Sequence, residues 1–315
     1  MPDLFIGGQW SAAVDGQVRE IRCPADGTLV ATVDEAGSKD AAAAIAAARD
    51  AFDRGPWPAT PAAERGRLLL RVADLLERDK DALARAESLD TGKRLVESEY
   101  DMDDIAGCFR YFGSLTGSGG RDRVVDTGNP DADSRVVHEP VGVCALITPW
   151  NYPLLQTAWK VAPALGAGNT FVLKPSELTP HTAVILMRLL SEAGLPDGVA
   201  NLVLSVVRDE SFGPVLTVET FRDDEEAVAL ANDTVYGLAG AVWSQDVGRA
   251  HKVASRIRAG TVWINDFHPY VPQAEWGGMK QSGFGRELGP AGLAEYQEAK
   301  HIWRNLAPRP QRWFA

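Results

Sequence analysis

The only thiols in the chain are three cysteines, and none of them has the surroundings of a nucleophile. Cys144 lies in the apolar run Val141–Ile147, where burial would raise the pKa of the thiol, so filling the core is its favoured role. Cys23 falls among N-terminal strands and Cys108 on a polar-rich helix, with no base suggested beside either. Their spacing matches no metal site, and an odd count argues against a disulfide framework. We therefore expect no bound metal and a reducing, cytoplasmic location.

Three polar side chains follow apolar strands, where they could act on a ligand. The amide of Asn151 can donate a hydrogen bond to a developing oxyanion, or it can cap the helix that begins near Pro153. Lys174 and Glu177 lie between a strand and a helix, which is where open α/β sheets bind ligands. The alternative is a solvated lysine and a glutamate in the first turn of the helix, favoured by the helix dipole.

Alternating strands and helices must position these side chains. The pattern predicts strands at Val141–Ile147, Thr170–Leu173 and Val199–Leu204, joined by helices at Leu154–Leu165 and Pro180–Glu192. This is one βαβαβ unit, half of a doubly wound nucleotide-binding sheet. The continuous apolar run of the first strand predicts a parallel strand that is covered on both faces.

The pattern restarts abruptly after residue 204. Strands are predicted at Val215–Phe221, Leu238–Trp243 and Thr261–Asn265, with helices at Glu225–Ala231 and Val247–Arg256 between them. Each half alone is an incomplete sheet with an exposed edge. Because two strands meet at residues 204 and 205 without turn residues, the sequence suggests that a segment was removed there.

The remaining segments frame these halves. Short strands are predicted over residues 5–33, and helices over Asp40–Phe52, Pro61–Leu89 and Glu97–Gly113. An exposed hairpin, Arg123–Val125 against Arg135–Val137, is of the kind used in oligomer contacts. The formal net charge of −11 disfavours nucleic acid and anionic membranes as partners, and no apolar run could span a bilayer. Small molecules are the expected ligands.

Four motifs occur in one order along the chain. The first three are TPWNYP at 148–153, KPSELTP at 174–180 and ESFGPV at 210–215. The fourth is GG at 277–278 followed by KQSGFGRE at 280–287. In this order the sequence resembles the aldehyde dehydrogenase superfamily over nearly its whole length. The resemblance implies an aldehyde dehydrogenase-like α/β fold with two incomplete doubly wound, Rossmann-like βαβαβ halves and a protruding oligomerisation hairpin. It divides the chain into a partial NAD-binding domain (1–120 and 138–204), an oligomerisation hairpin and strand (121–137 and 301–315) and a partial catalytic domain (205–300).

The resemblance also implies roles for single residues. Asn151 would be the oxyanion donor, and Tyr152, Trp159 and Trp276 would contact the substrate. The residues implied in cofactor binding are Trp150, Lys174, Ser176, Glu177, Glu210 and Phe212. Lys174 and Glu177 would hold the adenine-side ribose, and a carboxylate that accepts from a free 2′-hydroxyl repels a 2′-phosphate, which favours NAD over NADP.

The aromatic residues resemble those of the betaine-aldehyde branch. A trimethylammonium group cannot form hydrogen bonds but is attracted to aromatic faces, so a box of Tyr152, Trp159 and Trp276 would suit it. The segment Ile264–Tyr270 also looks like that branch. The alternative for Trp159 is a helix residue that packs in the core.

Three motifs that the implied chemistry needs are missing from this sequence. A thiolate must attack the aldehyde before hydride passes to nicotinamide, and a general base must activate water to release the acid. The family places a Gly-x-x-x-x-Gly turn, the base in an ELGGK-type motif and the cysteine in a GQ-x-C motif between the segments that here meet at Leu204 and Ser205. None of these motifs occurs anywhere in the sequence.

Three hypotheses follow. The chain is an inactive remnant that retains adenine-nucleotide binding, which we favour. Alternatively, it is a non-catalytic partner of full-length aldehyde dehydrogenases that forms homo-oligomers or hetero-oligomers through the hairpin and the C-terminal strand His301–Asn305. The third possibility is a working enzyme whose nucleophile escapes recognition; it predicts aldehyde-dependent NADH production that thiol alkylation abolishes.

Overall fold

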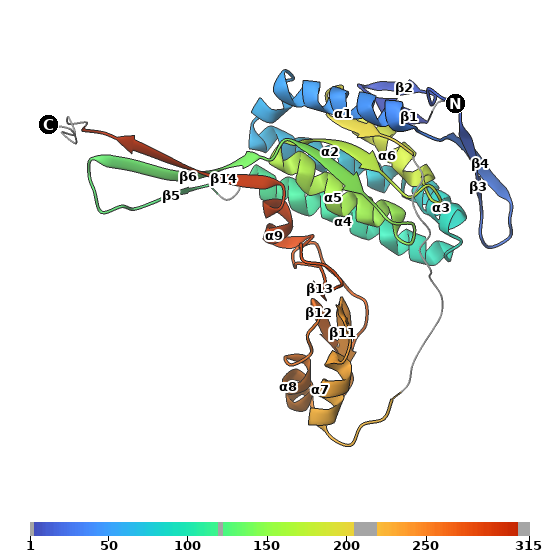
Figure 1. Cartoon of the computed structure of the whole chain (residues 1–315), viewed down its shortest axis with the longest axis vertical. Coiled ribbons are helices and arrows are strands. Elements are labelled where there is room, and N and C mark those ends of the chain that lie inside the picture. Colours follow the sequence, from blue (N-terminus) through green and yellow to red (C-terminus); the bar gives the residue numbers. More distant parts are fainter. Residues whose placement is uncertain (1–2, 119–121, 205–218, 308–315) are drawn as a thin grey trace. The chain divides into compact units, whose positions relative to one another are not determined.

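The computed structural model describes residues 3–118, 122–204 and 219–307, and these fall into two compact units. The first unit comprises Met1–Ser205 and Tyr296–Ala315, and the second comprises Val206–Glu295. Figure 1 gives the course of the chain through the elements of each unit. Each unit is described by itself below.

A five-stranded sheet in the order β2-β1-β9-β8-β7 forms the centre of the first unit. β7 (Val143–Ile147), β8 (Thr170–Lys174) and β9 (Ala200–Leu202) are parallel, and α5 (Pro153–Ala167) and α6 (His181–Glu192) connect them. β1 (Leu4–Ile6) pairs antiparallel with both β9 and β2 (Gln9–Ser11). The predicted βαβαβ unit is therefore confirmed, and β1 closes one of its two edges.

Helices cover this sheet in two layers. α1 (Ser38–Asp53) packs on the parallel strands through small side chains such as Ala44 and Ala48, which are fully buried. α5 and α6 pack on the strands and on each other, and α2 (Ala62–Arg78) and α4 (Leu95–Gly117) lie against α5. Because α5 is apolar on nearly every side, it is buried along almost its whole length, as expected for a central helix (Figure 1).

The edge strand β7 differs from the prediction that both of its faces are covered. Leu146 is 3% exposed, whereas Ile147 is 62% exposed and Ala145 is also exposed. Successive side chains of a strand point to opposite faces, so only one face of β7 packs on the unit. β8 is the only neighbour of β7 in this sheet, and the other edge of β7 is open within the described residues.

The predicted helix Pro61–Leu89 is two helices. α2 ends at Arg78, and α3 (Lys80–Thr91) begins after Asp79, whose backbone leaves the helical region. α3 ends at Gly92, which takes the left-handed conformation (φ 71°) that favours glycine. A short 3-10 helix, η1 (Trp57–Ala59), precedes α2. The break lets α3 lie against α4 and α6, which places its acidic residues next to the starts of later helices.

A three-stranded antiparallel sheet in the order β14-β6-β5 forms an arm of the first unit. β5 (Arg123–Val124) pairs with β6 (Ala132–Pro140) as the predicted hairpin, and β14 (Gln297–Asn305) pairs along the full length of β6. Figure 1 shows this sheet extending away from the helices of its unit. A second hairpin, β3 (Val18–Arg22) with β4 (Leu29–Asp34), lies among the predicted N-terminal strands.

The second unit has two small sheets. β11 (Ala239–Val242) and β12 (Thr261–Ile264) are parallel and joined by α8 (Val247–Ala254), while β10 (Tyr236–Gly237) pairs with β13 (Met279–Lys280). α7 (Asp224–Asn232) precedes them and α9 (Gly289–Ala294) follows. Residues 219–221 form no strand, and the rest of the predicted strand at Val215–Phe221 lies outside the described residues. The described part therefore holds one βαβ unit where the sequence predicted βαβαβ.

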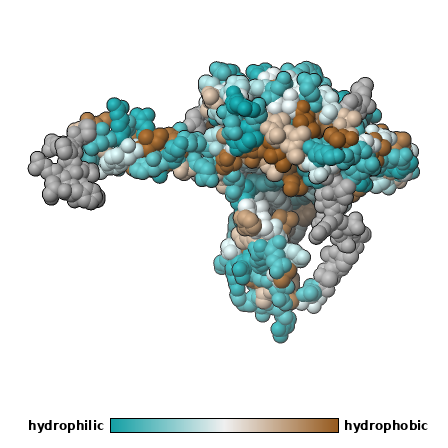
Figure 2. All heavy atoms as spheres, turned by 45° about the horizontal axis from the view of Figure 1, so that its top comes forward, coloured by the Kyte–Doolittle hydropathy of each residue, from teal (hydrophilic) through white to brown (hydrophobic). Residues whose placement is uncertain are grey.

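The surface of the first unit is mixed in polarity. Figure 2 shows a patch of apolar atoms on its side in view, surrounded by hydrophilic surface. None of the helices in the described ranges is both long and apolar enough to cross a bilayer.

Candidate nucleotide site and its surroundings

The candidate site lies at the carboxyl ends of the parallel strands. Ile147 at the end of β7 is in register with Lys174 at the end of β8, and the backbone N–H of Thr148 donates to the carbonyl of Lys174 over 3.2 Å. The loops that carry the TPWNYP and KPSELTP motifs therefore start side by side. Ligands of open α/β sheets bind at this edge, so the fold brings the two motifs to the expected place.

Lys174 and Glu177 form a preorganised pair. Their Nζ and Oε2 atoms are 3.8 Å apart, and their side chains are 17% and 15% exposed. Burial lowers the pKa of Lys174, and the neighbouring Glu177 opposes that shift. A half-buried ammonium beside a carboxylate offers a donor and an acceptor to adjacent hydroxyl groups, which is the chemistry needed to hold a ribose.

Two of the simpler alternatives raised from the sequence are wrong. α6 begins at His181 after the N-cap residue Pro180, so Glu177 lies before the helix and not in its first turn. α5 begins at Pro153 with Tyr152 as its N-cap residue and without a side-chain cap, so Asn151 does not cap it. Both residues lie in the loops, partly buried, as does Trp150.

Ser176 organises the second loop. It is 8% exposed, and its Oγ accepts a hydrogen bond from the N–H of Leu178 over 3.3 Å. Its carbonyl accepts from the N–H of Thr179. These local bonds close a turn around Glu177, which fixes the carboxylate relative to β8.

Tyr152 has neighbours that the sequence reasoning missed. Its hydroxyl donates to Glu97 over 3.1 Å, and the Lys93 ammonium lies 4.1 Å from its ring centroid. Burial and the charge of Glu97 raise the pKa of Tyr152 to about 12. Glu97 and Lys93 were missed because neither belongs to a motif, and only the fold brings them to Tyr152.

The other two aromatic candidates lie in different units. Trp159 is 4% exposed on α5, the core position that the sequence also allowed. Trp276 belongs to the second unit, where its ring lies 6.0 Å from Trp263 and 5.9 Å from Tyr270. Phe267 and His268 continue this chain of rings. The sequence analysis did not single out Trp263, because this residue lies within a predicted strand. Its spacing from the aromatic residues at 267, 270 and 276 could have indicated the cluster.

Two implied cofactor residues cannot be placed. Glu210 and Phe212 lie outside the described residues. Their assignment stays a prediction.

None of the three thiols has the environment of a nucleophile. Burial raises the pKa of Cys144 to about 11, which leaves it protonated at neutral pH. Cys23 and Cys108 are buried, with 5% and 0% exposure. No group of three or more His, Cys, Asp or Glu residues in the described ranges is arranged to hold a metal ion.

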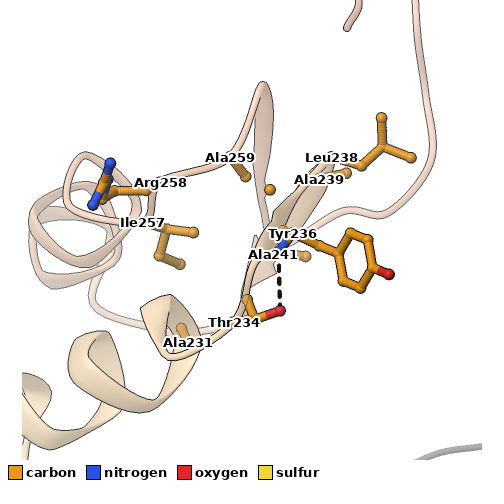
Figure 3. A pocket seen from close by; sticks show the side chains of 11 residues that line it. Ala231, Thr234, Tyr236, Leu238, Ala239, Ala241, Ile257, Arg258 and Ala259 are labelled. Atoms are coloured by element: carbon orange, nitrogen blue, oxygen red, sulfur yellow. Dashed lines mark hydrogen bonds between the residues drawn. The ribbon is translucent and has the colours of Figure 1, made fainter. Parts of the chain in front are cut away.

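The second unit contains a hollow of about 380 Å³ between α7 and the strands β10 and β11 (Figure 3). Its walls are small or aliphatic residues and backbone, with Thr234, Tyr236 and Arg258 as the polar exceptions. The N–H of Tyr236 donates to the Thr234 hydroxyl within it. None of the candidate site residues lines this hollow, and it offers no nucleophile or carboxylate for chemistry.

Comparison with known proteins identifies relatives over both units. The profile of the aldehyde dehydrogenase family matches residues 10–206 and 204–302. A betaine aldehyde dehydrogenase of Bacillus subtilis is 36% identical over an alignment of 485 residues that covers 99% of each chain. Betaine aldehyde dehydrogenase 1 of Oryza sativa is 29% identical, covering 99% of this chain and 97% of the rice protein.

A solved structure gives the same result. The crystal structure of betaine aldehyde dehydrogenase from Staphylococcus aureus in complex with NAD+ superposes with a TM-score of 0.95 and 32% sequence identity, covering 100% of this chain and 97% of the other. The family match, the sequence identity and the shared α/β fold agree, and the chain belongs to the aldehyde dehydrogenase family.

Proposed function

We propose that this chain binds NAD at the carboxyl ends of β7 and β8 and does not itself oxidise aldehydes. The observation that carries the binding half is the Lys174–Glu177 pair, half-buried and held at the strand end. The loop of Ser176 fixes this pair, and Trp150 and Asn151 flank it on the adjacent loop. NAD is the cofactor, in keeping with the NAD+ complex of the Staphylococcus relative.

The choice of NAD over NADP rests on Glu177. A carboxylate accepts hydrogen bonds from the free 2′-hydroxyl of NAD, while the 2′-phosphate of NADP would meet like charge. Lys174 could offset that repulsion only in part, because it is already paired with Glu177.

The lack of turnover rests on the missing nucleophile. Hydride leaves the aldehyde carbon only after a thiolate has added to it and formed a thiohemiacetal. The one partly exposed thiol, Cys144, has its pKa raised to about 11, so the thiolate population at neutral pH is negligible. The sequence contains none of the family motifs for the cysteine, the general base or the adjacent glycine turn.

The alignment supports an internal gap. The match to the Bacillus relative extends over 485 residues although this chain has 315, so at least 170 aligned positions, the difference, have no residue here. The two family matches meet at residues 204–206, where the sequence pattern restarts. In a doubly wound sheet, a strand that follows β9 must cross to the free edge of β7, because β1 already occupies the edge of β9. The open edge of β7 is what such a gap would leave.

The test combines calorimetry with an activity assay. We expect NAD to bind more tightly than NADP, and Glu177→Ala to weaken NAD binding roughly tenfold, as expected for loss of a buried hydrogen-bonded charge. Glu298→Ala, an exposed carboxylate on β14, serves as the matched control. With betaine aldehyde and NAD, no NADH should form above background. NADH production that iodoacetamide abolishes, from protein free of a full-length relative, would contradict the proposal.

The aromatic cluster of the second unit suggests a class of aldehyde ligand. We infer that this cluster of Trp263, Phe267, Tyr270 and Trp276 binds betaine aldehyde or a similar quaternary ammonium aldehyde, because it offers aromatic faces to a cation. Quenching of tryptophan fluorescence by betaine aldehyde, but not by an uncharged aldehyde of similar size, is the expected result. Equal quenching by the charged and the uncharged aldehyde would contradict this inference.

The arm suggests a second role as an interaction partner. β14 pairs with β6 through nine residue pairs, and most of its side chains are exposed, including Ile302 and Trp303 at 45% and 53%. We infer that this arm mediates a homo-oligomer or a hetero-oligomer with a full-length relative. Light scattering after gel filtration should give a mass above 34.0 kDa, and Trp303→Glu should reduce it to the monomer mass.

A further inference from the structure

Two buried carboxyl groups on α3 meet the start of α6. Glu87 and Asp90 are 0% and 2% exposed, and they lie one turn apart on the same face of α3. Asp90 accepts a hydrogen bond from the backbone N–H of His181 over 2.8 Å, which is the first residue of α6. Glu87 accepts from the hydroxyl of Thr182, the next residue, over 2.9 Å.

These bonds replace a cap that α6 lacks. Its N-cap residue is Pro180, which offers no side-chain hydrogen bond to the helix. The first N–H groups of a helix need acceptors when they are buried, and here α3 supplies one to His181 from a distant part of the chain.

α6 begins where the candidate site ends, because it follows the loop of Lys174 and Glu177. Lys93 connects the pair to the other motif loop, because its ammonium lies 2.8 Å from Asp101, 3.8 Å from Glu87 and over the ring of Tyr152. A displacement of the start of α6 would move the loop in front of it.

We propose that Asp90 and Glu87 are positioning residues that hold the Lys174–Glu177 loop of the nucleotide site in place by capping α6 from α3. The cap is a feature of the fold, and its role in nucleotide binding rests on the proposed function. The pair acts through the His181 backbone and the Thr182 hydroxyl, which distinguishes it from the residues of the loop.

The charge state of the pair gives a specific readout. Burial raises the pKa of Glu87 to about 7, opposed by Lys93 and by the Thr182 hydroxyl and raised further by Asp101. Burial raises the pKa of Asp90 to about 7 as well, opposed by the His181 N–H and reinforced by Glu87. The His181 ring faces Asp90 from α6, and its own pKa is lowered by burial and Arg188, with Asp3 opposing.

The first test uses the unaltered protein. In nuclear magnetic resonance spectra, the amide signal of His181 should shift with pH with a midpoint near pH 7, because its N–H donates to the Asp90 carboxyl, whose pKa burial raises to about 7. A His181 amide that exchanges as fast as an unbonded, solvent-exposed amide would overturn the proposal without any variant.

The second test uses matched substitutions and amide-resolved hydrogen exchange. Asp90→Ala removes the acceptor and should speed exchange at His181 roughly tenfold, the size expected for loss of a helix cap. Asp90→Asn keeps an acceptor of the same reach and should restore exchange to near the original rate. Asp81→Asn, an exposed acidic residue of α3, is the control.

The third measurement links the caps to the ligand. Asp90→Ala should weaken NAD binding about threefold to tenfold, and Asp90→Asn should recover it. If the original protein binds no NAD, the proposed function fails while the exchange experiment still decides whether the cap exists. If Asp90→Ala and Asp90→Asn behave alike in exchange, the acceptor is not what holds α6, and the inference is wrong.

Discussion

The two units of this chain bury their apolar residues very differently. The first unit contains nearly all the buried apolar side chains of the described residues, including Phe109, Phe112, Phe171 and most of α5. Among the described residues of the second unit, five apolar side chains are buried: Val228, Ala250, Ala259, Leu288 and Leu293. Large apolar side chains there, such as Trp243, Phe267 and Phe284, are instead more than half exposed.

The difference follows from how complete each sheet is. In the first unit, the antiparallel pair β1 and β2 extends the sheet of the parallel strands β7, β8 and β9. α1 covers the face of this sheet that lies opposite α5 and α6. In the second unit, β11 and β12 form an isolated parallel pair whose residues are at most half-buried. A two-stranded sheet with one covering helix buries too little apolar area to offset the entropy of ordering the chain. Unit 1 should therefore be the stable body of the molecule.

The largest effect should appear in hydrogen exchange. Amides of β8 in the first unit should exchange at least roughly a thousandfold more slowly than amides of β12 in the second, because β8 opens only on global unfolding. Exchange mass spectrometry on peptides covering 170–174 and 261–264 measures this. Equal protection of the two peptides would remove the contrast between the units.

Substitutions of buried residues should show which unit contributes most to the free energy of unfolding. Phe109→Ala, at a fully buried site on α4, should reduce the free energy of unfolding by about 3–5 kcal/mol. Val228→Ala on α7 should change the main transition by less than about 1 kcal/mol, since the second unit contributes little to it. Urea denaturation followed by circular dichroism tests both. A large loss from Val228→Ala would mean that the units unfold as one.

The pH dependence of stability should arise mainly in the first unit. The pKa of Glu87 rises from an ordinary value of 4.5 to about 7 on folding, and that of Asp90 from 3.8 to about 7. The folded state therefore binds protons more tightly, so this contribution is complete below about pH 4 and is lost as the pH rises through 7. For Glu87 the loss is on the order of 3 kcal/mol.

Substitution isolates that contribution. Glu87→Gln should reduce the dependence of the urea midpoint on pH between 4 and 8, with the contribution of Asp90 remaining, and Asp81→Asn should leave it unchanged. A Glu87→Gln profile that parallels the original protein would show that the carboxyl does not titrate in this range.

The smallest effect concerns the open edge of β7. Ile147→Lys should change the free energy of unfolding by less than about 0.5 kcal/mol, because the side chain is 62% exposed. It should also slow aggregation, since a charge on an exposed edge strand disfavours pairing with another chain. Leu146→Lys, one residue earlier and 3% exposed, should prevent folding. If Ile147→Lys is as damaging as Leu146→Lys, the outer face of β7 is covered after all.

Much of the fold could be predicted from local pattern and motif order. The helix starting at Pro153 and the strands around Val172 and Val242 follow from apolar periodicity and from glycine and proline at their ends. The motifs at Asn151 and Lys174 indicated the family and the edge of the sheet that binds ligands, because strand ends in a βαβαβ unit meet at one edge.

Other features depended on contacts between residues far apart in the sequence. The exposure of Ile147 could not be predicted, because an apolar run looks the same whether one or two layers cover it. Glu87 and Asp90 appeared to be ordinary polar residues of a helix, and only the packing of α3 against α6 brought them to the helix starts.

By itself the sequence determined the family, because the order of the motifs is read directly along the chain. The nucleotide-binding role of the loops and the lack of a usable cysteine stay predictions. The tertiary structure decided which carboxyls are buried, which strand edge is open and which unit has a core. Those properties depend on what packs against each element, and in this chain the packing partners can lie far away in the sequence. Trp57, for example, donates a hydrogen bond to the carbonyl of Asn169, 112 residues later.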